Sequence, residues 1–176
     1  EPTGTTGTWI PIPNETQEDR NNTRSLAIAL GATNFNGVED IEVHPLTGQL
    51  YFTAKGNDRV YRFTNEDLTV SGFETFVGGK PYVLNTEEGV FTEPWGGGND
   101  NLTFDDQGNL WVLQDGGRNY IWVVRPDHTQ AAPKVELFSS MPIGSEPTGL
   151  TFSPDYRFGF LSVQHPSSGN TPQTDA

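Results

Sequence analysis

The chain contains no cysteine, which excludes disulfides, thiolate metal ligands and a cysteine nucleophile within it. It is also poor in positive charge, because 10 Lys and Arg stand against 23 Asp and Glu, a net charge of −13. Such a surface argues against binding to nucleic acid, and it repels phosphate esters unless bound cations reverse the local sign. No apolar run approaches the roughly 20 residues of a membrane helix, so no membrane insertion is expected. The opening EPTGTTGT has none of the features of a signal peptide.

What the chain does contain favours a β protein rich in turns. Its 176 residues suit one domain or part of a larger one, and they include 20 Gly, 13 Pro and 11 Phe. A single short stretch, residues 23–32, has the pattern of a helix, with Gly31 as its stop signal. Everything after it is expected to form short strands and turns.

The sequence repeats itself with a drifting period. Each repeat has three alternating apolar residues, a polar turn, and a second apolar run that ends in a polar loop. The three repeats are IEVHPLTGQLYFTAKG (41–56), LTFDDQGNLWVLQDGG (102–117) and LTFSPDYRFGFLSVQH (150–165). Val43, Phe104 and Phe152 correspond, at spacings of 61 and 48 residues.

The first two repeats continue alike, with third strands expected at 59–64 and 119–124 and fourth strands at 73–79 and 134–140. Four antiparallel strands in about 45 residues are typical of a β-propeller blade. The predicted fold is therefore all-β, with about two and a half four-stranded blades of a propeller. Because that number cannot close a ring, we expect the chain to be a piece of a longer protein. The predicted divisions are a lead-in with a short helix (1–36), a blade (37–79), an inter-blade loop (80–97), a blade (98–143), a partial blade (144–166) and a polar tail (167–176).

Charged residues cluster where the repeats open. In a meander, the loop entering the first strand and the loop leaving the second lie on the same face of the blade. The residues at these two places are Glu39, Asp40, Asp100, Asn101 and Glu146 before the first strands, and Lys55, Asp115, Arg118, Gln164 and His165 after the second strands. Single acids at such places often only cap turns. Three converging carboxylates, however, repel one another unless a cation that prefers oxygen ligands lies between them, such as Ca²⁺ or a hard trivalent metal.

Three stretches together resemble the PhoX-type alkaline phosphatases, over about residues 24–166. They are GATNFNGVEDIEVHPLTGQLYFT, DNLTFDDQGNLWVLQDGG and EPTGLTFSPDYRFGFLSVQHP, in the family's order. The resemblance implies the C-terminal portion of a secreted or periplasmic six-bladed propeller. It further implies a central site that holds iron and calcium ions and hydrolyses small phosphomonoesters.

The resemblance also implies roles for particular acids. Glu39 matches the acid that opens the GAT-led blade, and Glu146 matches the acid of the E-x-TG motif; both are metal ligands in the family. Asp100 occupies a third acid position and is expected to bind metal as well. These three residues are the predicted ligands of Ca²⁺ and Fe³⁺.

Four further residues are expected near the substrate. Asp115 lies in the family's DG turn and His165 in its QHP motif, and both are interpreted as close to the site. Lys55 or Arg118, expected on the same face, would pair with a phosphate oxygen. No catalytic residue is assigned from the sequence.

The chain departs from the family in two respects. The family's metal-ligating cysteine lies in an N-terminal half, and this chain has no cysteine. Gly144 and Ser145 replace the residues that usually precede the E-x-TG acid, where the family makes a local phosphate contact. The rest of the propeller is therefore expected as a partner that completes the site.

Two other interpretations remain open from the residues alone. One is a lactonase-like propeller enzyme with a single central Ca²⁺, and the other is a non-catalytic propeller fragment that binds calcium or a partner protein. Metal content distinguishes them, because iron with calcium supports the phosphatase, calcium alone the lactonase, and no stoichiometric metal the fragment.

Overall fold

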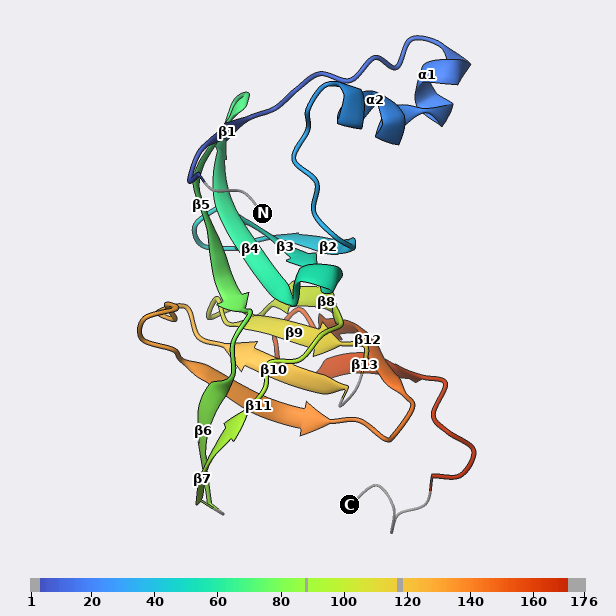
Figure 1. Ribbon diagram of the computed structural model, residues 1–176. Helices are drawn as coiled ribbons and strands as arrows, with labels where there is room; N and C mark the ends of the chain where they lie inside the picture. Colours follow the sequence, from blue (N-terminus) through green and yellow to red (C-terminus); the bar gives the residue numbers. More distant parts are fainter. Residues whose placement is uncertain (1–3, 88, 117–118, 171–176) are drawn as a thin grey trace.

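The structure, a computed structural model, describes residues 4–87, 89–116 and 119–170. It consists mainly of antiparallel strands in four sheets, which confirms the all-β prediction (Figure 1). Among the described residues, no helix is both long and apolar enough to cross a membrane.

The first sheet contains the first predicted blade and one strand from the lead-in. Its strands run in the order β1-β5-β4-β3-β2. They are β1 (Gly7–Thr8), β2 (Val38–Val43), β3 (Leu50–Ala54), β4 (Arg59–Glu66) and β5 (Thr69–Gly78), with the 3-10 turn η1 (Lys55–Asn57) between β3 and β4. The strand β1 pairs with β5 and gives this sheet a fifth strand that the repeat pattern did not predict.

The second and third repeats form the next two sheets. The second sheet has the order β11-β10-β9-β8, and the third has two paired strands. Their strands are β8 (Asn99–Phe104), β9 (Leu110–Gln114), β10 (Tyr120–Val124), β11 (Val135–Ser140), β12 (Glu146–Phe152) and β13 (Gly159–Gln164). Val43, Phe104 and Phe152 each end the first strand of their sheet, so the repeat in the sequence is a repeat in the structure.

Residues 80–97, expected as a loop, contain a hairpin. Its strands are β6 (Tyr82–Thr86) and β7 (Gly89–Glu93), and it extends away from the two blades in Figure 1. Alternation explains it, because Tyr82 and Leu84 are buried while Val83 between them is exposed. The Tyr82 hydroxyl also accepts a hydrogen bond from the backbone N–H of Gly78, at 2.8 Å, which anchors the hairpin to the end of β5.

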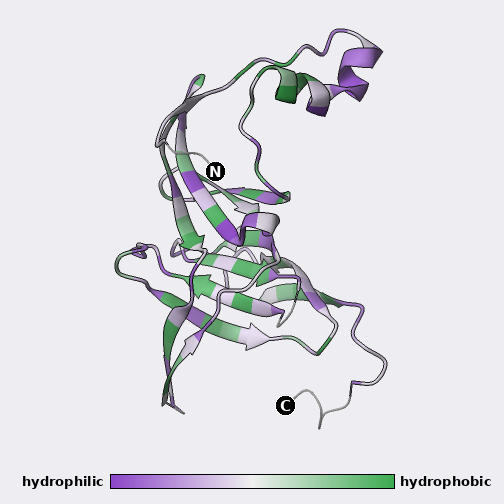
Figure 2. Cartoon of the chain, in the orientation of Figure 1, coloured by the Kyte–Doolittle hydropathy of each residue, from purple (hydrophilic) through white to green (hydrophobic). Residues whose placement is uncertain are grey.

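The lead-in contains two short helices instead of one. α2 (Thr23–Ala29) lies within the predicted stretch, and α1 (Gln17–Asn21) precedes it. The sequence carried a signal for α1, because Thr16 and Asp19 form a capping box in which each side chain accepts the other's backbone N–H. Both helices lie far from the second sheet, and α1 is strongly polar (Figures 1 and 2).

One buried cluster joins the first sheet, the hairpin and the second sheet. It includes Tyr51 and Phe76 from the first sheet, Tyr82 from the hairpin and Trp122 from the second sheet. Trp95 stacks on Trp122 with ring centroids 5.0 Å apart, and both side chains are buried. Figure 2 shows apolar residues gathered along these strands. The two blades are therefore held together by a shared core.

All three first strands carry a β-bulge at a similar place. The register shifts between Val38 and Ile41 in β2, and between Asn99 and Asn101 in β8. In β12 it shifts between Thr148 and Thr151. A bulge re-aims the side chains beside it and is common next to functional sites.

Candidate metal site

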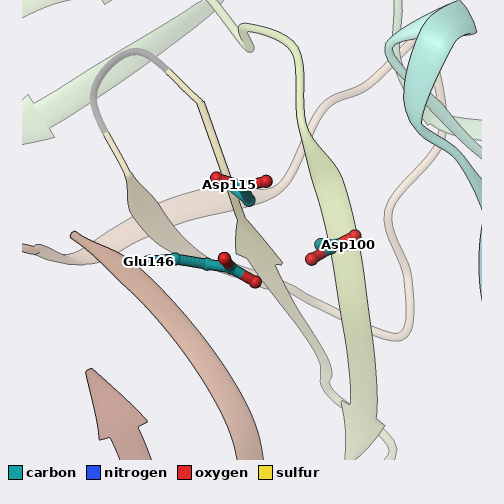
Figure 3. Close-up of side chains that lie close together, drawn as sticks. All are labelled: Asp100, Asp115 and Glu146. Atoms are coloured by element: carbon teal, nitrogen blue, oxygen red, sulfur yellow. The ribbon is translucent and has the colours of Figure 1, made fainter. Parts of the chain in front are cut away.

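Three carboxylates from two blades converge at one place. Asp100, Asp115 and Glu146 each offer a ligand atom, and these atoms all lie within 4.8 Å of one another. Asp100 lies in β8, Asp115 follows β9, and Glu146 begins β12. Figure 3 shows the three side chains directed into the same space between these strands. This group is called the acidic cluster below.

A buried pair of amides lies directly beside two of these acids. Gln114 donates to the Asn99 side-chain oxygen at 3.0 Å and to the Trp95 carbonyl at 2.6 Å. Asn99 and Gln114 are opposite each other in the β8–β9 ladder, and each immediately precedes an acid of the cluster. Their hydrogen bond therefore keeps Asp100 and Asp115 at matched positions on neighbouring strands.

Gly98 permits the close approach of the two strands at this point. The Asp115 N–H donates to the Gly98 carbonyl at 2.7 Å. The Gly98 backbone has a φ of +85°, and a Cβ built there would lie 1.7 Å from the Asp115 carbonyl oxygen. Only glycine fits this position, since any side chain would push the Asp115 loop away.

Lys55 supplies a positive charge from the first blade. Its Nζ lies 2.6 Å from an Asp115 carboxylate oxygen and 3.4 Å from an Asp100 carboxylate oxygen. The hydrogen bond with Asp115 is the largest contribution that raises the Lys55 pKa, so the ammonium form is favoured. Lys55 thus occupies the position of a counter-ion between two acids of the cluster.

Glu146 is a poorly solvated acid of the cluster, and its charged form is disfavoured. Its side chain is 14% exposed, and its pKa is raised, first by burial and then by the neighbouring Asp100 and Asp115 carboxyls. His165 opposes this effect from a distance of 3.5 Å. A bound cation would remove the cause of the shift, because it would offset the repulsion among the three acids.

The raised pKa of Glu146 predicts a pH effect on the metal-free chain. The folded state binds the Glu146 proton more tightly than the unfolded state does, so protonation stabilises the fold. This stabilisation is complete below the ordinary pKa of 4.5 and is lost as the pH rises through the raised pKa of the folded state. We therefore expect the stability of the native chain, relative to Glu146→Gln, to increase as pH falls from 7 toward 4.5. Urea unfolding of both proteins across this range measures it, and a pH-independent difference would contradict it.

An open cavity of about 180 Å³ lies at the acidic cluster. It is lined by Asp115, Gly116, Asn119, Gly144, Ser145, Glu146 and His165. Pockets that enclose drug-sized ligands are larger, roughly 300–1,000 Å³. A cavity of this size, with acids at its wall, suits a small polar group held through cations.

The structure brings together most, but not all, of the residues singled out from the sequence. Asp100, Asp115 and Glu146 converge, with Lys55 and His165 in contact with them. Arg118 lies outside the described residues. The sequence analysis did not identify the pair Asn99 and Gln114, because the sequence does not show whether a polar residue at the end of a strand is buried. Gln114 at the end of an apolar run was the available signal.

The predicted ligand Glu39 lies in the first blade, on β2. It is an exposed residue of β2 and does not belong to the described group of acids within 4.8 Å. Glu39 lies four residues before Val43, and Asp100 lies four residues before Phe104, so these two acids are equivalent in the repeat. Glu146 lies six residues before Phe152. The equivalence expected among the three acids therefore holds for two of them, and Thr148 occupies the corresponding place in β12.

The donor set of the cluster fits the metals that the resemblance implies. Three carboxylates within bonding reach of one point are the ligands that Ca²⁺ and other hard cations prefer. The elevated pKa of Glu146 and the Lys55 ammonium between two acids show that this place favours positive charge.

Comparison with known proteins agrees with the resemblance seen in the sequence. The family described as alkaline phosphatase PhoX matches residues 2–167. Among solved structures, Pseudomonas fluorescens PhoX in complex with vanadate, a transition state analogue, is similar to this chain with a TM-score of 0.66 and 26% sequence identity. The similarity covers 88% of this chain and 33% of that protein. None of the curated protein sequences matches the chain significantly.

Proposed function

The chain belongs to the PhoX alkaline phosphatase family, and we propose that it forms part of a metal-dependent enzyme that hydrolyses small phosphomonoesters. The observation that carries this proposal is the convergence of Asp100, Asp115 and Glu146 beside a small open cavity. Phosphate esters carry the same sign of charge as this surface, so a site built from acids can accept them only through cations.

The residues of the cluster would hold these cations. Asp100, Asp115 and Glu146 are the proposed ligands here, for calcium and iron, and Glu39 is a proposed ligand that the remaining blades would bring into use. Bound metal ions offset phosphoryl charge and activate an oxygen nucleophile. Lys55, already within hydrogen-bond distance of Asp115, is proposed to pair with a phosphate oxygen once the acids bind metal. His165 would position Glu146 through their contact.

The remaining blades are the proposed partner of this segment. The chain spans about a third, 33%, of the similar Pseudomonas protein. Apolar residues of β13 are exposed, among them Phe160 and Val163, as are Ile41 and Val43 of β2. We propose that neighbouring blades cover these two strands, and that the whole enzyme is secreted or periplasmic.

The proposal predicts how activity depends on the rest of the propeller. With Ca²⁺ and Fe³⁺ supplied, residues 1–176 alone are expected to turn over p-nitrophenyl phosphate more slowly than about 1 per second, the low end of ordinary enzyme rates. The same segment joined to the remaining blades in one polypeptide is expected to reach an ordinary rate. Steady-state kinetics with elemental analysis of the purified protein measures both.

Two results would count against a phosphatase. Hydrolysis of lactones with calcium as the sole bound metal would favour the lactonase-like alternative. A complete polypeptide without stoichiometric metal or phosphatase turnover would favour a non-catalytic propeller. Glu146→Gln is the control, since loss of turnover in that variant assigns the activity to this site.

A further inference from the structure

Asp40 connects the first blade to the first strand of the second. One of its carboxylate oxygens accepts the backbone N–H of Leu102 at 2.8 Å, and the other accepts its own neighbour, the N–H of Ile41, at 2.8 Å. The Asp40 N–H in turn donates to the Thr53 hydroxyl at 3.0 Å. Leu102 lies two residues after Asp100, so this bond fixes the β8 backbone just beyond an acid of the cluster.

Asn101 makes the corresponding connection one blade further on. Its side-chain oxygen accepts the backbone N–H of Gly149 at 2.8 Å and the hydroxyl of Thr148 at 2.6 Å. Asn101 lies 61 residues after Asp40, the spacing of the first two repeats. Thr148 and Gly149 follow Glu146 by two and three residues, so this bond fixes β12 just beyond another acid of the cluster.

We propose that Asp40 and Asn101 are positioning residues, each of which sets the place of a cluster acid in the next blade. Asp40 acts through β8 on Asp100, and Asn101 acts through β12 on Glu146. An effect of these two residues on activity rests on the proposed function. Their hydrogen bonds, however, are present without bound metal.

The bulges explain why the strands need this help. A bulge interrupts the ladder and leaves a residue without its regular cross-strand partner. The bulge of β8 includes Asp100, and the bulge of β12 begins two residues after Glu146. Near a bulge the ladder alone holds the backbone less firmly, and the bond from the preceding blade supplies the missing constraint.

The same bonds link blade packing to site geometry. If neighbouring blades shift, the acceptor oxygen moves with one blade and the donor N–H with the other. The distance between Glu146 and the pair of Asp100 and Asp115 therefore depends on Asn101. Side chains that orient metal ligands in this manner typically contribute about 10- to 100-fold to metal affinity.

The first test uses the metal-free chain and the ¹³C signals of its carboxylates. Asn101→Ala removes the acceptor, and Asn101→Asp keeps an oxygen at the same place as the matched control. We expect Asn101→Ala to shift and broaden the Glu146 carboxylate signal, and Asn101→Asp to leave it sharp. Asp40→Ala, compared with Asp40→Asn, is expected to affect the Asp100 signal in the same way. Unchanged Glu146 and Asp100 signals in the alanine variants would overturn the inference.

The second test measures Ca²⁺ affinity by calorimetry in the same chain. We expect Asn101→Ala to raise the Kd about 10-fold or more, and to have no further effect in a Glu146→Gln background, because the residue acts through Glu146. A fall in stability with unchanged Kd would show a purely structural role. If the native chain binds no Ca²⁺, the cluster needs the remaining blades to hold the ion, while the carboxylate signals still decide the positioning role. Thr148→Val removes one donor with little change of shape, and it replaces Asn101→Ala if that variant does not fold.

Discussion

Replacing Glu146 by glutamine is expected to weaken Ca²⁺ binding by this chain more than about 100-fold, because loss of a residue that merely orients a ligand already costs roughly 10- to 100-fold. Glu146 is largely shielded from solvent, its pKa is raised by burial and by repulsion from Asp100 and Asp115, and a cation would relieve that repulsion. Glutamine keeps the size and one oxygen of the side chain but removes the charge. The effect therefore reports coordination and not packing.

Titration calorimetry with Ca²⁺, and with Tb³⁺ as a trivalent probe, measures this change. Glu66→Gln is the matched control in the same chain, since Glu66 is an exposed acid at the end of β4 and outside the acidic cluster, and its Kd is expected to stay within about twofold. Lys55→Met removes the ammonium that competes for Asp115 and Asp100, so it is expected to tighten binding. Equal losses in Glu66→Gln and Glu146→Gln would mean that general negative charge, and not this cluster, attracts the ion.

Replacing Trp122 by alanine is expected to lower the free energy of unfolding by about 3–5 kcal/mol. Trp122 is fully buried, stacks on Trp95, and donates to Gln114 at 2.9 Å. Its removal leaves a cavity where the hairpin segment meets the second sheet, and leaves a buried Gln114 oxygen without this donor. Because Gln114 also bonds Asn99, the variant is expected to disturb the acidic cluster as well.

Urea unfolding followed by far-ultraviolet circular dichroism measures this loss without relying on tryptophan emission. Trp9→Ala is the matched control, since Trp9 is 50% exposed, its indole N–H donates to the exposed Asn65 side chain, and its ring makes one edge contact with Phe63. That variant is expected to lose about 1 kcal/mol or less. A similar loss in both variants would contradict the view that the Trp95–Trp122 stack holds the hairpin and the second blade together.

The repeat made most of the fold predictable from the sequence. Alternating apolar residues around Val43, Phe104 and Phe152 located the first strands of three sheets, and the continuation of two repeats located their third and fourth strands. This works because the two-residue period of a strand and the turn chemistry between strands are local properties. The hairpin at 80–97 was missed, since its alternation is short and belongs to no repeat.

The site was only partly predictable, for a different reason. The sequence by itself determined the family resemblance, the blade pattern, and an excess of acids where first strands begin and second strands end. Tertiary structure decided which acids meet: Asp115 joined Asp100 because Gly98 and the buried Asn99–Gln114 pair bring β8 and β9 close together. Glu146, which opens the next blade, lies with them, whereas Glu39 in the preceding blade is not part of this group. The neighbours of a carboxylate come from strands that are far away in the sequence, and no local sequence pattern shows which of these strands lie close together in space.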